Sequence, residues 1–190
     1  MWFRPKLWQR RFFRGPRLTM LAISNAARSG FLGEPPTLNP ARMTVVPLGV
    51  DTRVFRPRTE DIRAIRAKLE LPAAAPLVTL VARFQDVKGH HIFLEMARRV
   101  LHTKPGARFA IAGDNVLGGK AGEDYKRRIV DMAGADPSLR NAVKFLGWVS
   151  ATEELIAASD IVVCSSFFES FGMVHIEAMA CEVPDRKSVV

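Results

Sequence analysis

Residues 165–184, SSFFESFGMVHIEAMACEVP, decide how the rest of the chain is interpreted. Small polar residues open this segment, and from Met173 onward the apolar residues recur at helical spacing. A short apolar run, Ile161–Cys164, comes directly before it. The pattern therefore predicts a buried strand at Ile161–Cys164, a loop at residues 165–171 and a helix at residues 172–181.

The predicted loop and helix carry two glutamates, Glu169 and Glu177, with Gly172 between them. A helix that follows a strand directs its free backbone N–H groups and its dipole toward the carboxyl end of the sheet, where they bind anions. Gly172 allows a ligand to approach the backbone closely. Two carboxylates beside an anion site suit a ligand with phosphates and many hydroxyls, such as a nucleotide sugar. The alternative is an ordinary amphipathic helix with an exposed glutamate at each end.

The composition is that of a folded globular protein. Of the 190 residues, 48% are hydrophobic and 25% are charged. No apolar run approaches the ~18 residues that a membrane-spanning helix needs. Cys164 and Cys181 lie on either side of the predicted helix, which is too long for a disulfide to bridge. We therefore expect buried free thiols in a reducing compartment.

The net charge of +9 is concentrated at the start of the chain. Residues 1–17 contain six Arg and Lys residues, five Trp and Phe residues and no acidic residue, which leaves +3 for the remainder. Cations mixed with aromatic residues suit an anionic lipid surface. The alternative is a helix that packs its apolar side on a domain. Stacking on nucleic-acid bases is a third interpretation, but nothing downstream supports it, so no nucleic-acid partner is expected.

Apolar segments alternate with turn residues along the chain. Continuous apolar runs such as Leu77–Val81 are typical of parallel strands that helices cover on both faces. Strands and helical patterns alternate from Leu77 to Cys181, and this predicts an α/β fold, a Rossmann-like parallel sheet with helices on both faces. Ser24 and Thr152 are predicted to cap the helices that follow them. The predicted strands are residues 18–23, 44–46, Leu77–Val81, Arg108–Ala112, 142–146 and Ile161–Cys164.

Two cations follow the predicted strand Leu77–Val81. Arg83 and Lys88 lie five positions apart, in the loop that leads to the next helix. Cations at the carboxyl end of a strand, next to a helix start, can clamp a diphosphate; ordinary solvated cations are the alternative. His90 and His91 are expected to be polar residues at the helix start rather than metal ligands, because no cysteine or carboxylate stands at ligand spacing with them.

The opening segment resembles the signature of the retaining glycosyltransferases with two facing Rossmann-like domains, also called glycosyl transferases group 1 or family 4-like. That signature is a Glu, then Phe-Gly, then a second Glu followed by Ala-Met-Ala. This chain departs from the family at Cys164, where Pro is frequent, and at Glu182, where Gly is frequent, and neither departure touches the ligand groups. The matching residues are Glu169, Phe171, Gly172, Glu177, Ala178, Met179 and Ala180.

Four further segments resemble the same family and occur in its order. Residues 47–57 match the Pro-x-Gly-Val-Asp and Phe-x-Pro pattern that crosses between the two domains. Arg83 and the Lys-Gly pair at Lys88 match the residues that the family uses on the donor's diphosphate. A Gly-Asp pair begins at Gly113, although the asparagine after it departs, and residues 147–149 match a Gly-x-Val segment near the nucleotide base.

The resemblance implies a two-domain enzyme of the GT-B type, of which this chain is a fragment. Residues 1–43 would be the C-terminal remnant of the acceptor domain, 44–58 the interdomain linker and 59–184 the truncated donor-binding domain. The implied reaction moves a sugar from a UDP- or GDP-linked nucleotide-diphosphate donor to a carbohydrate or lipid-linked acceptor, with retention of configuration. No cofactor and no metal are implied, and the fragment itself is expected to be inactive.

The family's functional residues carry over to the matching positions. Arg83 and Lys88 would hold the diphosphate. Glu169 would accept hydrogen bonds from the donor sugar, and Glu177 would bind the ribose hydroxyls. The implied catalytic residues are Arg83, Lys88 and Glu169, and the implied donor-binding residues are Gly113, Val149, Phe171, Gly172, Met173, Val174 and Glu177.

Both ends of the chain are expected to be incomplete relative to that family, with Met1 an internal or false start. The last six residues, DRKSVV, can be encoded by a string that matches a widely used sequencing adapter, so residues 185–190 are a candidate non-native tail. Without the family's following strand, Ile161–Cys164 or a neighbouring strand is expected to keep an unpaired, apolar edge.

Two other classes of protein stay open at this point. A nucleotide-sugar epimerase has a similar two-domain fold, and a non-catalytic module would bind a nucleotide sugar without turnover. The expected location is the cytoplasm, with peripheral contact between the basic start of the chain and the inner face of the membrane as an open alternative.

Overall fold

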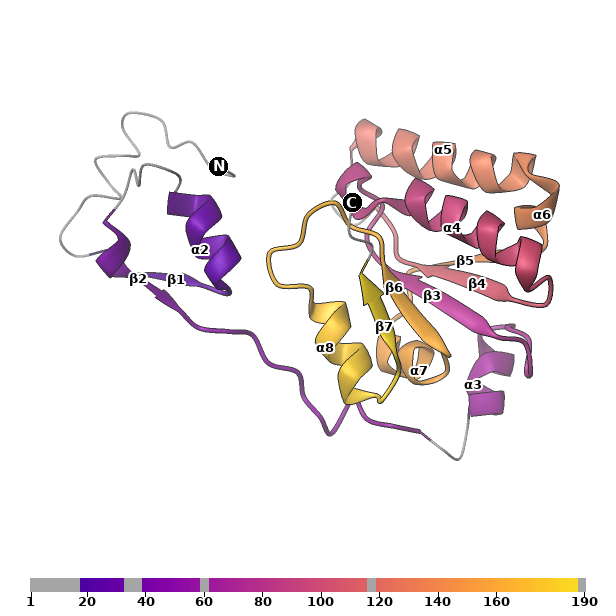
Figure 1. Cartoon of the computed structure of the whole chain (residues 1–190), viewed down its shortest axis with the longest axis horizontal. Helices are drawn as coiled ribbons and strands as arrows, with labels where there is room; N and C mark the ends of the chain where they lie inside the picture. The colour runs from indigo at the N-terminus through magenta and orange to yellow at the C-terminus, as the bar shows by residue number, and fades with distance from the viewer. Residues whose placement is uncertain (1–17, 33–38, 59–61, 116–118, 188–190) are drawn as a thin grey trace. The chain divides into compact units, whose positions relative to one another are not determined.

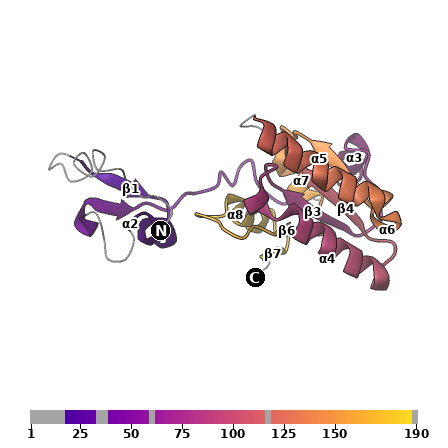
Figure 2. The ribbon, with the colours of Figure 1, turned by 90° about the horizontal axis from the view of Figure 1, so that it is seen from above.

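The computed structural model describes residues 18–32, 39–58, 62–115 and 119–187, and the chain divides into two units. The smaller unit contains Met1–Gly49 together with Glu169–Met173, and the larger contains Val50–Phe168 and Val174–Val190. Figures 1 and 2 show the elements of each unit from two directions. The boundary after Gly49 falls inside the predicted linker, residues 44–58. The basic segment 1–17, with its predicted lipid contact, lies outside the described residues.

The smaller unit is built on two short parallel strands, β1 (Met20–Ala22) and β2 (Met43–Val45). They correspond to the predicted strands, although each is bounded differently. Helix α2 (Asn25–Leu32) lies between them in the sequence. The Ser24 hydroxyl accepts a hydrogen bond from the Ala27 N–H at 2.9 Å, so Ser24 caps α2 as predicted. The element order is β1, α2, the 3-10 turn η1 (Pro40–Arg42) and β2.

The larger unit is a doubly wound α/β domain, which confirms the predicted fold class. Its five parallel strands lie in the order β5-β4-β3-β6-β7. Along the chain its elements are α3 (Ile62–Lys68), β3 (Leu77–Val81), η2 (Asp86–Lys88), α4 (His90–Thr103), β4 (Arg108–Ala112), α5 (Lys120–Ala135), α6 (Pro137–Arg140), β5 (Val143–Gly147), α7 (Thr152–Ala157), β6 (Ile161–Cys164), α8 (Met173–Ala180) and β7 (Asp185–Lys187).

Helices cover both faces of this sheet, with α4, α5 and α6 on one face and α3, α7 and α8 on the other (Figure 1). Strand β4 shows how its sequence produces this layering. Phe109 and Ile111 join the core beneath α4 and α5. Ala110 and Ala112 pack on the opposite face, in one cluster with Leu155 of α7. Because successive strand residues alternate between faces, a doubly covered strand must be apolar at consecutive positions.

Some predicted boundaries and caps differ from the structure. Thr152 is the first residue of α7, and the N-cap position belongs to Ala151, which makes no side-chain capping bond. The predicted Thr152 cap is therefore wrong. Helix α8 lies one residue inside the predicted range 172–181 at each end, and β5 is shifted one residue later than predicted.

Strand β6 is not an edge strand, so the expected unpaired edge at Ile161–Cys164 is wrong. It pairs in parallel with β3 on one side and with β7 on the other. The Val162 N–H donates to the Pro184 carbonyl at 2.9 Å, and the pairing continues to Cys164. Parallel pairing uses main-chain atoms, so residues 185–187 form a strand although their side chains, Asp-Arg-Lys, are those of an exposed segment. The outer strand on this side is β7.

Two composition-based features also appear in the structure. Cys164 and Cys181 are buried free thiols, as predicted. Among the described residues, none forms part of a helix that is both long and apolar enough to span a membrane.

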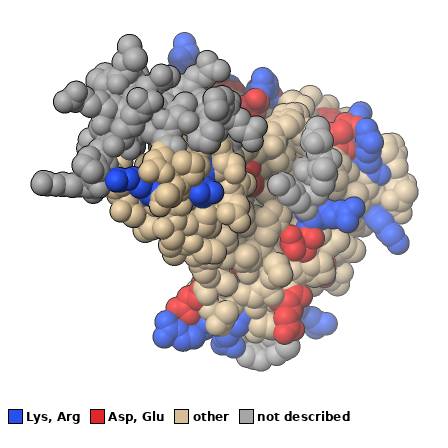
Figure 3. Space-filling model, turned by 60° about the vertical axis from the view of Figure 1, so that its left-hand side comes forward, with Lys and Arg blue, Asp and Glu red and all other residues tan. Residues whose placement is uncertain are grey.

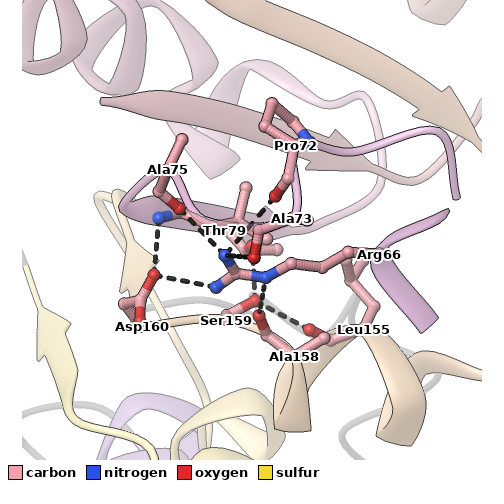
Figure 4. Close-up of polar contacts among 10 residues, drawn as sticks. Arg66, Pro72, Ala73, Ala75, Thr79, Leu155, Ala158, Ser159 and Asp160 are labelled. Atoms are coloured by element: carbon pink, nitrogen blue, oxygen red, sulfur yellow. Dashed lines mark hydrogen bonds and ion pairs between the residues drawn. The ribbon is translucent and has the colours of Figure 1, made fainter. Parts of the chain in front are cut away.

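A buried arginine, Arg66 on α3, ties the amino end of the sheet together (Figure 4). Its Nε donates to the Ala158 carbonyl and its Nη1 to the Ala75 carbonyl, both at 2.9 Å. Its Nη2 contacts Asp160 Oδ2 at 2.9 Å, and the same oxygen accepts the Leu77 N–H at 2.7 Å. One guanidinium therefore joins α3, the approach to β3 and the turn before β6. Nothing in the sequence distinguishes Arg66 from Arg63, the exposed arginine of the same helix.

Replacing Arg66 with methionine is expected to lower the free energy of unfolding by about 2–3 kcal/mol. The change keeps the apolar stem but leaves buried carbonyls without a donor, while half-exposed Asp160 recovers some solvation. Urea unfolding followed by circular dichroism measures the change. The matched control is Arg63→Met on the same helix, where the side chain is exposed, with an expected change within about 0.5 kcal/mol. Equal effects of the two substitutions would contradict this role for Arg66.

Candidate functional site

The candidate site lies at the carboxyl edge of the sheet, where β3 and β6 are neighbours. The chain leaves β3 for α4 on one face, and it leaves β6 for α8 on the other face (Figure 1). This is the point at which the direction of winding reverses. In open parallel sheets, the two departing connections leave a crevice there, in which ligands bind.

Main-chain hydrogen bonds join the segments that follow β3, β4 and β5. The Phe84 N–H donates to the Asp114 carbonyl at 3.2 Å, and the Gly113 N–H donates to the Gly147 carbonyl at 2.7 Å. Gly113 has a φ of 142°, and a Cβ there would lie 1.9 Å from the Ala82 carbonyl oxygen. Gly113 is therefore required by close backbone packing, which is a structural reason for the glycine at this predicted donor-binding position.

The segments that follow β3 and β6 are joined in a similar way. The Phe167 N–H donates to the Val87 carbonyl, and the Ser165 hydroxyl donates to the Lys88 carbonyl, each at 2.9 Å. Gly89 has a φ of 63°, and a Cβ on it would lie 2.1 Å from the Ser165 carbonyl oxygen. The glycine stands out in the sequence as part of the Lys-Gly pair, but its contact with Ser165 does not. Only the small size of the residues at positions 89 and 165 could have indicated a close approach of the two segments.

The two predicted clamp residues both lie on the β3–α4 connection. Arg83 is exposed just beyond β3, and Lys88 is partly buried at the end of η2, directly before Gly89. Because the loop after β6 fixes the Lys88 carbonyl, the backbone at Lys88 is held at the crevice. The ammonium of a neighbouring lysine, Lys126, is paired with Asp114 Oδ1 at 2.6 Å, which lowers the pKa of that carboxyl.

Helix α8 carries Glu177 and Val174 in the larger unit. Burial raises the pKa of Glu177, and its half-buried carboxylate makes no hydrogen bond or ion pair with the described residues. Such a group is a candidate for ligand binding, since desolvation without a protein partner is unfavourable. Val174 packs against the cluster that contains Val162 and Ala178, so its side chain belongs to the core.

The rest of the predicted motif, Glu169, Phe171, Gly172 and Met173, belongs to the smaller unit. In that unit the Ser24 hydroxyl donates to the Ser170 carbonyl at 2.5 Å. Gly172 has a φ of 82°, a left-handed conformation that favours glycine directly before a helix. The combined action of these residues with Arg83 and Lys88 stays a prediction.

Val149 lines a separate hollow of about 440 Å³ beyond β5. Leu146 and Trp148 line it as well, and Trp148 is 67% exposed. The turn before it depends on Gly147, whose φ is 65°. The lining also includes charged residues, among them Lys144 and Glu154, so the hollow is of mixed polarity. The position of Val149 near a base stays a prediction.

Figure 3 shows the charge distribution on one face of the molecule: Lys and Arg side chains stand beside Asp and Glu side chains in small mixed groups. Printed ion pairs in the described residues follow the same pattern, for example Arg53 with Asp51 at 2.7 Å and Arg99 with Glu95 at 3.0 Å. The described face therefore presents no single continuous basic stripe of the kind that tracks a nucleic-acid backbone.

His90 begins α4, as predicted, but its side chain belongs to the core. It is fully buried, and its ring stacks on Phe84 with the centroids 4.4 Å apart. The Tyr125 hydroxyl accepts the His90 N–H at 3.2 Å. Burial lowers the pKa of His90 to about 4, so the ring is neutral at pH 7. No group of three or more potential metal ligands occurs in the described part of the chain.

The topology, with its switch point between β3 and β6, is that of a Rossmann-like domain of the GT-B type. A family model of glycosyl transferases group 1 matches residues 61–184. The chain belongs to this family.

The curated relatives include the D-inositol 3-phosphate glycosyltransferases of Mycobacterium tuberculosis and Mycobacterium bovis. Each is 40% identical to the chain over 148 residues, which is 77% of this chain and 29% of theirs. The chain thus spans less than a third of the length of these relatives.

Solved structures show the same architecture. Anabaena HepE, crystallised in complex with UDP and glucose, has a TM-score of 0.77 and 26% identity, covering 89% of this chain and 44% of that one. A glycosyltransferase from Rickettsia africae has a TM-score of 0.81 at 21% identity, covering 97% of this chain and 48% of its own. The second likeness, at this identity, concerns the fold alone.

Acidification from pH 6.5 to pH 4 is expected to lower the free energy of unfolding by about 3 kcal/mol through His90. In this window the unfolded chain protonates the ring, while the folded chain keeps it neutral, so stability falls as pH falls. Urea unfolding at several pH values measures the slope. His90→Leu should flatten it, and His102→Gln, at the exposed end of the same helix, should not. An unchanged slope in His90→Leu would rule out this contribution.

Gly89→Ala is expected to destabilise the larger unit by at least about 2 kcal/mol, since the new Cβ meets a carbonyl at a left-handed residue. Gly134→Ala, in helix α5 with nothing within 4 Å of the new Cβ, is the control and should stabilise by up to about 1 kcal/mol. Thermal melts of both variants test the pair. Stabilisation by Gly89→Ala would show that the close approach is not a constraint.

Proposed function

We propose that this chain is the donor-binding part of a retaining glycosyltransferase, which moves a sugar from a nucleotide-diphosphate donor to a carbohydrate or lipid-linked acceptor. The observation that carries the proposal is the position of Arg83 and Lys88 at the switch-point crevice, on a connection that the loop after β6 holds in place. Membership of the family supports the general reaction. The crystal structures of Anabaena HepE with UDP-glucose support a nucleotide sugar as the donor class.

In this reaction the bond between the sugar and the diphosphate breaks, and charge develops on both parts. Arg83 and Lys88 would stabilise the departing diphosphate as fixed cations. Backbone N–H groups of residues 172–174, with Phe171 beside them, would add the anion site of a helix start. Glu169 would accept hydrogen bonds from the sugar hydroxyls and so orient the reacting ring.

The nucleoside end of the donor has two candidate contacts in the larger unit. Glu177 has a raised pKa and no partner among the described residues, so ribose hydroxyls would supply the missing donors. The acidic residue of a dinucleotide site binds ribose in the same way. The hollow at Val149 would take the base, and Gly113 would let the ligand pass close to the backbone. Met173 and Val174 would contribute backbone groups.

No metal is required by this scheme, because two cations and a helix start can balance the diphosphate charge. Donor binding is therefore expected to be unchanged after treatment with EDTA. An epimerase would instead convert the donor without an acceptor, and a binding module would hold it without any turnover. Product analysis of the full-length protein separates these outcomes.

The first test is isothermal titration calorimetry of the 190-residue chain with UDP, UDP-glucose, GDP and free glucose. We expect binding of a nucleotide diphosphate and none of free glucose. Lys88→Ala should weaken binding by about 10- to 100-fold, as expected for the loss of a charge-assisted hydrogen bond.

The control variant is Lys104→Ala, at the opposite end of α4, where the side chain is exposed. It keeps the same change in net charge and should bind like the wild type. Equal weakening in both variants would indicate general electrostatics instead of a clamp. Normal binding by Lys88→Ala would reject the proposed role of Lys88.

A further inference from the structure

A second cluster of reactive groups lies outside the proposed donor contacts. It contains Cys164 at the end of β6, His175 on α8 and Asp185 on β7. The His175 Nδ1 atom lies 2.5 Å from Asp185 Oδ2. Three neighbouring elements thus bring together a thiol, an imidazole and a carboxylate.

The pleat of the sheet explains why these groups meet. Val162 and Cys164 are two residues apart, so their side chains point to the same face of β6. Val162 packs in one cluster with Ala178 of α8, which identifies that face as the one beneath α8. In the parallel register Val162 is paired with Asp185, whose side chain therefore emerges on the same face.

The environment of His175 favours its charged form. The Cys164 sulfur is the largest cause that raises the pKa of His175, and the Asp185 carboxylate adds to it, whereas burial acts in the opposite direction. Asp185 occupies Nδ1, while Nε2 is buried and makes no hydrogen bond of ordinary geometry with the described residues. The thiol also donates to the Ser166 hydroxyl at 3.5 Å.

We propose that Cys164 and His175 form a thiolate–imidazolium pair, oriented by Asp185, and that Cys164 is a modification site for peroxides and soft electrophiles. A cation beside a cysteine favours the thiolate, which is the nucleophilic form. The carboxylate holds the ring by Nδ1, as the third member of a catalytic triad does, and leaves Nε2 without a hydrogen bond among the described residues. The inference does not depend on the proposed donor binding. It concerns the 190-residue chain itself, because Asp185 lies in residues 185–190, the candidate non-native tail.

The reaction with hydrogen peroxide balances without any further reagent. The thiolate sulfur attacks one peroxide oxygen, a sulfur–oxygen bond forms and the oxygen–oxygen bond breaks. The departing hydroxide takes the proton of the His175 imidazolium. The products are a cysteine sulfenic acid, neutral imidazole and water. With iodoacetamide, the same thiolate forms a sulfur–carbon bond and iodide leaves.

Cys181 is a matched internal control for this proposal. Both cysteines are 4% exposed, so burial alone gives them the same access to small reagents. Burial raises the pKa of the Cys181 thiol, and nearby Glu177 and Glu153 raise it further, although Arg58 opposes them. Burial therefore disfavours a thiolate at Cys181, where the surrounding charges oppose one another, whereas the charge of His175 favours a thiolate at Cys164.

The test is to treat the folded 190-residue chain at pH 7 with iodoacetamide and follow each cysteine by peptide mass spectrometry. Cys164 should be alkylated at least about 10-fold faster than Cys181. His175→Gln should remove most of this difference, and Asp185→Asn should reduce it by a smaller factor, since it disturbs only the orientation of the ring. Peroxide followed by dimedone should label Cys164 selectively.

A second measurement separates chemistry from unfolding. In denaturant the two cysteines should react at similar rates in the wild type and both variants. Equal rates for Cys164 and Cys181 in the folded wild type, whether fast or negligible, would overturn the proposal. An unchanged preference for Cys164 in a folded His175→Gln variant would also overturn it.

Discussion

The arrangement at the carboxyl edge of the sheet depends on the close approach of Gly89 to Ser165. A Cβ at position 89 would lie 2.1 Å from the Ser165 carbonyl oxygen, which leaves no space for any side chain. The Ser165 hydroxyl is in turn bonded to the Lys88 carbonyl. The two connections that wind in opposite directions are thereby held together, and the main chain at Lys88 is fixed in place. Rigid backbone support of this kind is what a charged ligand-binding group requires.

The sequence predicted the central strands accurately for a physical reason. The ranges Leu77–Val81, Arg108–Ala112 and Ile161–Cys164 are the same in prediction and structure. Each is a nearly continuous apolar run, because helices cover both of its faces, and turn residues bound it. Helix ends were less predictable, as at Thr152, because a residue suited to capping can equally begin the helix. Of the candidate site, the placement of Arg83 and Lys88 after β3 followed from the strand pattern, whereas the roles of all the site residues, the clamp included, stay predictions.

What the sequence did not reveal depends on contacts between distant residues. Arg66 can be buried only because the fold places the Ala75 and Ala158 carbonyls where its guanidinium can donate to them. His90 is a core residue because Phe84 and Tyr125 enclose it. Strand β7 exists because β6 offers a main-chain partner to a segment that is itself charged. None of these features has a local pattern, since each is set by what the fold brings alongside.

Two nearby residues of the β3–α4 connection differ in charge at pH 7. Lys88 is partly exposed and cationic, while His90, two residues later, is buried and neutral at pH 7. Burial is the main cause of the low pKa of His90, and the Lys88 charge adds to it. Because coupling between two sites is reciprocal, an anion that neutralises Lys88 would raise the pKa of His90 slightly, though burial would still keep the ring neutral. The buried part of this connection therefore carries no positive charge at pH 7, and the core behind Lys88 does not compete for an anion.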